Sequence, residues 1–139
     1  MSKSVLIIDD DDDLSSLLRD FLVSKGFTVS RAHDAPSGVE KARQLLPDLI
    51  TMDFNMPGEN GVEAYNHLRS YPETAVIPVI FFSSTMLGIM RRMVQENPRV
   101  KFLKKGCTTQ ELERYVNEMA ALPKLAPPPP PPISKDVDY

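Results

Sequence analysis

The chain has 139 residues, of which 42% are hydrophobic and 25% are charged, which is enough for one compact domain but not for two. Its 16 basic and 19 acidic residues give a formal net charge of −3. This charge balance supplies no basic surface of the kind that binds nucleic acid or an anionic membrane, so we expect neither partner.

Cysteine content and the start of the chain indicate the compartment. The single cysteine, Cys107, cannot form an internal disulfide. Only four apolar residues, at positions 5–8, precede an acidic run, which is too short for a signal peptide or a membrane span. We therefore expect the protein to be cytoplasmic.

Short β-rich runs alternate with longer stretches of helical periodicity. Residues 5–8 are uninterrupted and apolar, as in a parallel strand that is covered on both faces. Apolar residues then recur at helical spacing up to Leu22, and Gly26 stands where a left-handed cap would end the helix. The same alternation predicts strands at 27–31, 49–52, 76–82 and 100–104, and helices at 36–45, 62–68, 86–95 and 110–122.

Five strand-helix units in succession predict an α/β fold with a doubly wound, five-stranded parallel sheet. The composition changes at Pro123, and six consecutive prolines begin at Pro127. We therefore expect a domain over residues 1–122 and a linker or tail over 123–139, with the proline run in polyproline II form. Two alternatives to a linker remain for residues 123–139. The segment could dock onto an SH3-like partner, or the chain could be cut from a longer one.

Acidic residues follow two of the predicted strands. Asp9 and Asp10 come directly after the first strand, and Asp53 follows the third. If these strands are neighbours, three carboxylates share one cleft, where like charges favour a bound cation. An open site with few oxygen ligands suits Mg²⁺, which in turn predicts a phosphate ligand. We expect the later acids, Asp11 to Asp13, to form a solvated loop near the positive end of the next helix.

Two further strand ends carry complementary groups. Ser83 follows the fourth strand and offers a hydroxyl, while Lys104 and Lys105 end the fifth and offer an ammonium. A carboxylate nucleophile, a metal, a hydroxyl and an ammonium together form a set suited to phosphoryl transfer. Each group alone is common at strand ends, and their joint order along the chain is what indicates the chemistry.

From residue 4 to about residue 122 the sequence resembles the response-regulator receiver family of bacterial two-component signalling. The matching segments are VLIIDD at 5–10, DLITMDFNMPG at 48–58 followed by ENG at 59–61, PVIFFS at 78–83 and FLKK at 102–105. The resemblance implies a flavodoxin-like (βα)5 fold with strand order 2-1-3-4-5.

The resemblance also assigns roles to residues of the site. Asp53 becomes the phosphoacceptor, and Mg²⁺ is held by Asp9, Asp10, Asp53 and the backbone carbonyl of Asn55. The phosphoryl group would come from a sensor histidine kinase or a phosphotransfer protein. Because the domain acts on itself, no turnover of a separate substrate is expected.

The remaining roles concern the response to phosphorylation. Ser83 becomes the switch hydroxyl, Lys105 binds the phosphoryl group, and Phe102 is the aromatic residue that swings inward on activation. The downstream protein would bind the face formed by the last two helices and the last strand. Strand alternation places Lys105 on the side of Leu103, opposite Lys104, and the spacing from Ser83 favours Lys105.

Two departures from the family pattern keep other functions open. Gly106 stands where a proline preceded by a cis peptide is usual, so we expect the last loop to differ in shape, and Ser84 replaces a small apolar residue. A receiver-like interaction module that works without phosphorylation is therefore one alternative. A phosphatase of the haloacid dehalogenase type is another, but it requires an Asp-x-Asp nucleophile on the first strand.

Histidines and methionines receive simpler interpretations. We expect His33 and His67 to be surface residues away from the acidic cleft. Met86, Met90 and Met93 recur at helical spacing, which favours core packing over an adaptable partner surface.

Overall fold

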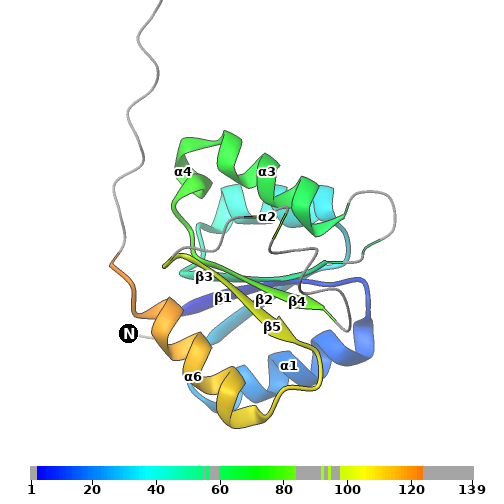
Figure 1. Cartoon of the computed structure of the whole chain (residues 1–139), viewed down its shortest axis with the longest axis vertical. Helices are drawn as coiled ribbons and strands as arrows, with labels where there is room; N and C mark the ends of the chain where they lie inside the picture. The colour runs from blue at the N-terminus through cyan, green and yellow to red at the C-terminus, as the bar shows by residue number, and fades with distance from the viewer. Residues whose placement is uncertain are drawn as a thin grey trace, which may run out of the picture.

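Five parallel strands in the order β2-β1-β3-β4-β5 form the centre of the molecule in the computed structural model (Figure 1). The structure describes residues 3–54, 56, 60–83, 92, 94 and 98–123. The strands are β1 (Ser4–Ile8), β2 (Thr28–Ala32), β3 (Leu49–Asp53), β4 (Val79–Ser83) and β5 (Val100–Lys104). The helices are α1 (Asp12–Ser24), α2 (Ala35–Leu45), α3 (Gly61–Ser70), α4 (Pro72–Ala75) and α6 (Thr109–Ala120). This confirms the predicted α/β fold and its flavodoxin-like strand order.

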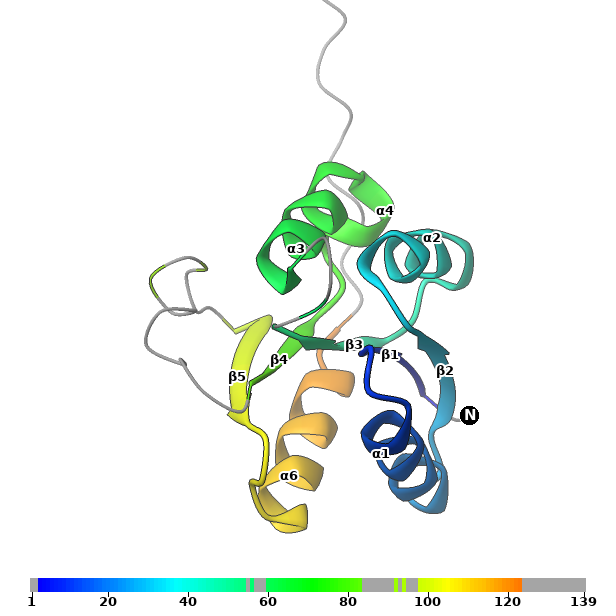
Figure 2. The same ribbon diagram turned by 90° about the vertical axis from the view of Figure 1, so that its right-hand side faces the viewer.

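Helices cover both faces of the sheet, α1 and α6 on one side and α2, α3 and α4 on the other (Figure 2). Successive strand residues point to opposite faces, so Ile7 packs into the core beneath α1 and α6, while Leu6 and Ile8 pack into the opposite core. A strand with two buried faces needs apolar residues at every position, which explains the uninterrupted run in β1.

The helices begin where the sequence places capping side chains. Asp11, Asp34, Asn60 and Thr108 each accept a hydrogen bond from a backbone N–H in the first turn of α1, α2, α3 and α6. Gly26 follows α1 with φ of +94°, a conformation that side-chain-bearing residues rarely adopt. The predicted end of the first helix is therefore confirmed.

The fourth strand was predicted too long at its start. Its first residues, from Val76, instead follow the short helix α4, and β4 begins only at Val79, after Pro78. Proline supplies no N–H to a sheet ladder, whereas Pro72 suits the first turn of a helix. The buried Thr74 hydroxyl donates to the carbonyl of Leu68 at 2.6 Å, which ties α4 to α3.

Several sequence-based expectations fall on residues that the structure does not describe. Most of the helix expected at 86–95 lies there, including Met86, Met90 and Met93. The tail after Pro123 lies there entirely. In the part of the chain that is described, no helix is long and apolar enough to cross a membrane.

Candidate functional site

The carboxyl ends of the strands bring the predicted site residues together. β1 and β3 pair directly with Ile8 opposite Met52, so the residues that follow, Asp9 and Asp53, lie side by side. Backbone hydrogen bonds hold both positions, because Asp9 N donates to Ala32 O at 3.1 Å and Phe54 N donates to Phe82 O at 3.0 Å. The main chain therefore fixes where both carboxylates emerge.

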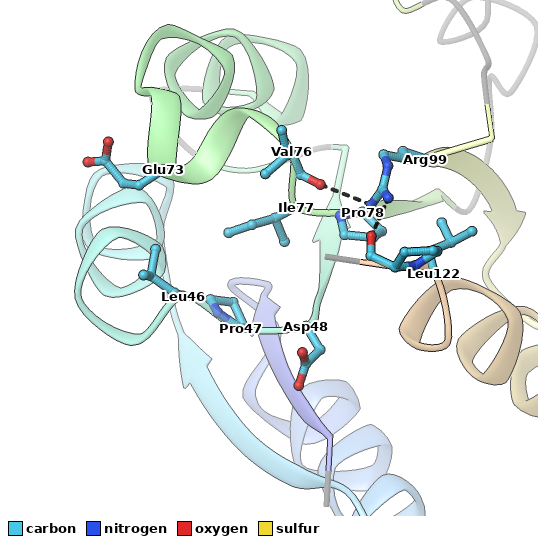
Figure 3. A pocket seen from close by; sticks show the side chains of 10 residues that line it. Leu46, Pro47, Asp48, Glu73, Val76, Ile77, Pro78, Arg99 and Leu122 are labelled. Atoms are coloured by element: carbon cyan, nitrogen blue, oxygen red, sulfur yellow. Dashed lines mark hydrogen bonds between the residues drawn. The ribbon is translucent and has the colours of Figure 1, made fainter. Parts of the chain in front are cut away.

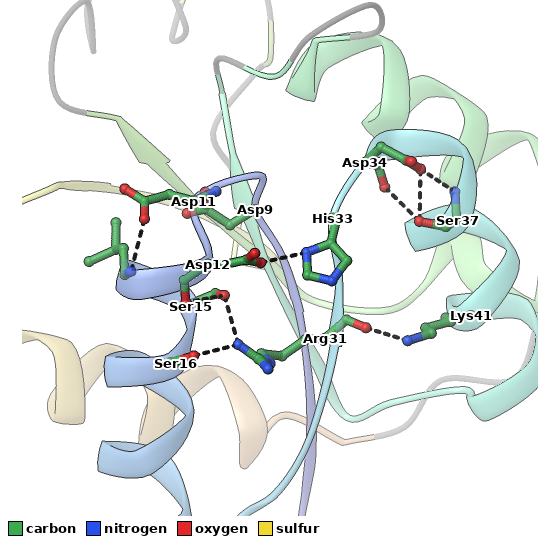
Figure 4. A network of polar contacts seen from close by, with 11 residues as sticks. Asp9, Asp11, Asp12, Ser15, Ser16, Arg31, His33, Asp34, Ser37 and Lys41 are labelled. Carbon is green, nitrogen blue, oxygen red and sulfur yellow. Dashed lines mark hydrogen bonds and ion pairs between the residues drawn. The ribbon is translucent and has the colours of Figure 1, made fainter.

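Three carboxylates form the acidic cluster at this edge. Asp9, Asp10 and Asp53 each place one oxygen within 4.8 Å of the other two. Asp9 is 6% and Asp53 4% exposed, whereas Asp10 faces solvent. The N–H of Asp11 donates to Asp9 Oδ1 at 2.9 Å, which orients that carboxylate (Figure 4). Hard oxygen donors in an open cluster fit a divalent ion such as Mg²⁺.

Lys105 reaches into this cluster from the end of β5. Its Nζ lies 3.1 Å from Asp53 Oδ1 and 3.6 Å from Asp9 Oδ2, and its side chain is 22% exposed. Its backbone N–H donates to Ser83 O at 2.7 Å, so β4 and β5 together set its position. Lys104 is exposed. Of the two lysines, Lys105 therefore lies against the carboxylates.

The electrostatics of the cluster reflect burial and pairing. Burial raises the pKa of Asp9, and it outweighs the N–H of Asp11 and the charge of Lys105, which both act in the opposite direction. Burial alone would lower the pKa of Lys105, but the hydrogen bond to Asp53 and the charge of Asp9 outweigh it and raise that pKa. A raised pKa keeps Lys105 charged at neutral pH.

The two predicted switch residues lie on neighbouring strands. Ser83 is fully buried at the end of β4, opposite Lys104 in register. Phe102 is 5% exposed and stacks on Phe81, with ring centroids 5.6 Å apart. The aromatic ring that was expected to swing inward is thus already packed inward in this structure.

Gly61 is a further residue that shapes the site and that the sequence did not single out for this role. A Cβ at this position would lie 2.6 Å from the carbonyl oxygen of Asp53 and 3.0 Å from the Cα of Phe54. The N–H of Gly61 also donates to Phe54 O at 2.9 Å. The start of α3 is thereby packed against the backbone of Asp53. A glycine directly after the helix cap Asn60 was the available signal. Asn55 lies outside the described residues.

The loop after β5 turns at Gly106. This residue has φ of +95°, and Cys107 N donates to Lys104 O at 3.1 Å to close the turn. Proline is held near φ of −65° and cannot adopt this conformation. The expected difference in loop shape therefore has a direct cause in the glycine.

The histidines behave largely as expected. His67 and His33 are exposed, but Nδ1 of His33 lies 2.8 Å from Asp12 Oδ1, so it is nearer to the acidic run than predicted (Figure 4). Asp12 and Asp13 occupy the first turn of α1, and Asp11 caps it. The three acids thus lie at the positive end of the helix dipole, as expected, but Asp12 and Asp13 belong to the helix itself and not to the expected loop.

Known proteins share both the sequence pattern and the fold. A polar-differentiation response regulator, DivK, from Brucella ovis is 35% identical over 125 residues, which cover 89% of this chain and 90% of that protein. The phosphate regulon transcriptional regulatory protein PhoB of Rhizobium meliloti is 30% identical over 125 residues, covering 90% of this chain. The chain spans only 49% of the length of PhoB.

Solved structures of response regulators and receiver domains have the same fold as this chain. A putative response regulator from Chloroflexus aurantiacus has a TM-score of 0.80 at 25% identity, covering 88% of this chain and 100% of its own. The receiver domain of a sensor histidine kinase from Pseudomonas aeruginosa, solved with magnesium in its active site cleft, has the same fold, with a TM-score of 0.78 at 22% identity over 88% of this chain and 100% of its own. The sequence pattern of the response regulator receiver domain matches residues 5–117, and the chain belongs to that family.

Proposed function

We propose that the chain accepts a phosphoryl group on Asp53 from the phosphohistidine of a sensor histidine kinase or a phosphotransfer protein. The observation that carries this proposal is the position of Lys105, whose Nζ lies 3.1 Å from the Asp53 carboxylate within an acidic cluster. Receiver domains are signalling domains of two-component systems, which agrees with a reaction directed at the domain itself.

The residues divide the chemistry among them. An oxygen of Asp53 forms a bond to phosphorus as the phosphorus–nitrogen bond of the donor breaks. The donor imidazole, protonated on its other ring nitrogen, takes the electron pair of that bond and leaves as neutral imidazole. Mg²⁺, when held by Asp9, Asp10, Asp53 and the carbonyl of Asn55, supplies positive charge to the phosphoryl oxygens. Lys105 and the hydroxyl of Ser83 contact the other phosphoryl oxygens, and positioning of these groups supplies most of the catalysis.

The output of the domain would be a change in its binding surface. Contact between Ser83 and the phosphoryl group would favour one arrangement of β4 and β5, and with it the inward position of Phe102. The downstream protein would then bind the face built from the last two helices and the last strand. Residues 123–139 would act as a spacer. We expect the protein to work in the cytoplasm, without direct contact to nucleic acid or membrane.

Phosphorylation by a small donor tests the proposal. We expect acetyl phosphate with Mg²⁺ to add one phosphoryl group to the chain, mapped to Asp53, and Asp53→Asn to abolish it. Asp13→Asn removes an exposed carboxylate at the start of α1 and should leave labelling unchanged. Label at Asp9, Asp10 or a histidine would contradict the assignment. Absence of label on the wild-type chain would instead support an interaction module that works without phosphorylation.

A further inference from the structure

A groove with a volume of about 190 Å³ lies at the amino ends of the strands, at the edge of the sheet opposite the acidic cluster (Figure 3). Leu46, which follows α2, forms one end of the groove, and Leu122, which follows α6, forms the other. Ile77 and Pro78, which precede β4, lie between them. Three segments that are distant in sequence thus build one mainly apolar groove.

The groove leaves apolar surface uncovered. Only four large apolar side chains are strongly exposed in the part of the chain that the structure describes, and Leu45 and Leu46 are two of them. Leu46 is 45% exposed and lies on the groove wall. An isolated leucine on a surface needs no explanation, but a leucine that continues an apolar groove provides a place where another apolar group can bind.

The C-terminal tail starts in this groove. Pro123, the last residue that the structure describes, forms part of the groove wall. Arg99 donates one hydrogen bond to the carbonyl of Pro123 and another, of 3.2 Å, to the carbonyl of Val76. The guanidinium group therefore ties the start of the tail to the segment that precedes β4. Every residue after Pro123 is attached to the chain at the edge of the groove.

We propose that the tail of this chain binds in the groove, with Leu125 as its apolar anchor and the proline run, from Pro127, continuing along Leu46. Leu125 follows Pro123 by two residues, which span at most about 7 Å, so it is within reach of the groove. A cavity of about 150 Å³ holds a benzene molecule, so about 190 Å³ admits one leucine side chain.

Covalent attachment favours the tail over any free partner. A segment on a short link has an effective concentration in the millimolar range, so even a contact with a Kd of about 1 mM keeps about half of the chains in the bound form. Prolines lose little backbone freedom on binding, which lowers the entropic cost further. Because the groove lies at the end of the sheet away from Asp53, this contact does not depend on phosphorylation. The tail beyond the proline run remains available as the spacer.

Paired substitutions within the tail test the anchor without altering the domain. Leu125→Ser removes the anchor, and we expect the amide resonances of Leu46, Asp48 and Ile77 to shift in the ¹⁵N-labelled full chain. Ile133→Ser removes an apolar side chain beyond the proline run and should leave these resonances unchanged. Groove resonances that respond to neither substitution, or equally to both, would overturn the proposal.

The backbone mobility of the tail gives a second test, from the side of the groove. We expect the amide order parameter of Leu125 to exceed about 0.6, below which a backbone is flexible. Leu46→Asn removes the apolar wall and should lower this value, and asparagine suits the φ of +46° at this position, so the variant should fold. Leu17→Gln, which removes a 69% exposed leucine from α1, should have no effect. A Leu125 order parameter below about 0.6 in the wild type, or one unchanged in Leu46→Asn, would refute the contact.

A spin label shows which chain supplies the tail. Cys107 is the only cysteine, so Cys107→Ala with Ser134→Cys places one nitroxide label on the tail. We expect the label to broaden the amide resonances of Asp48 and Ile77 more than that of Asp10 at the opposite end of the sheet. Mixing spin-labelled chains with unlabelled ¹⁵N chains should broaden neither groove resonance. Selective broadening in that mixture would assign the groove to the tail of a second copy and contradict the proposal, as would uniform broadening within one chain.

Discussion

Nζ of Lys105 lies 3.1 Å from Asp53 Oδ1 and 3.6 Å from Asp9 Oδ2, so one ammonium group bridges two buried carboxylates from different strands. Such an arrangement is stable only because the charges offset one another in a site largely removed from water. It also places a cation where a phosphoryl group on Asp53 would need one.

The two neighbouring lysines should differ in their effect on phosphorylation. Lys105→Ala removes the ammonium beside Asp53, and we expect the rate of phosphorylation by acetyl phosphate, or the structural response to it, to fall about 10- to 100-fold, as for loss of a charged hydrogen bond. Lys104→Ala removes an exposed charge, whose pairings are worth about 0 to 1 kcal/mol, and should have little effect. Intact mass and beryllofluoride-induced chemical shifts measure both. If Lys104→Ala proved the damaged variant, the assignment would move by one residue.

Removal of the same ammonium should strengthen metal binding. A cation at the acidic cluster is repelled by Lys105, so Lys105→Ala should bind Mg²⁺ about three- to tenfold more tightly than the wild type. Isothermal titration or Mg²⁺-dependent chemical shifts give the dissociation constants. Lys25→Ala, which removes a lysine on the surface between α1 and α6, serves as the control. Weaker Mg²⁺ binding by Lys105→Ala would show that the lysine supports the metal site.

Ser83 and Phe102 should respond together. Ser83→Ala removes the hydroxyl that would contact the phosphoryl group, so we expect Phe102 ring resonances to stop responding to beryllofluoride while beryllofluoride still binds. In the wild type the response should be a shift toward the inward, Phe81-stacked conformation seen here. Equal Phe102 responses in the wild type and Ser83→Ala would argue that the two residues are not coupled.

Gly61→Ala should disturb the site through the backbone of Asp53. Its Cβ would approach the Asp53 carbonyl to 2.6 Å, and we expect a loss of about 1 to 3 kcal/mol in unfolding free energy together with slower phosphorylation. Gly26→Ala is the control, because its Cβ meets no atom and only the positive φ is penalised, at about 1 kcal/mol. It should lower stability without slowing phosphorylation. Denaturant unfolding and phosphorylation rates separate the two effects.

The order of elements could be predicted from the sequence because local chemistry determines it. The apolar run of β1 and the glycine that follows α1, Gly26, each act within a few residues of the chain. The site carboxylates could be found in the same way, since parallel strands present their carboxyl ends at one edge of the sheet. The start of β4 was misplaced because apolar β-branched residues such as Val76 suit a strand as well as a buried turn.

Only the tertiary structure decided which groups actually touch. Strand alternation and spacing favoured Lys105 over Lys104, but the distances to Asp53 and Asp9 depend on how β4 and β5 meet. The hydroxyl of Thr51, which has no hydrogen-bond partner among the described residues, had no signal in the sequence. The contact between Gly61 and the Asp53 backbone was signalled only by the position of the glycine after the helix cap Asn60. The first is the lack of a hydrogen-bond partner for Thr51 among the described residues, and the second depends on how the start of α3 packs back against the end of β3. Periodicity and motif spacing describe neither, because they report which face a residue occupies and not what lies opposite it.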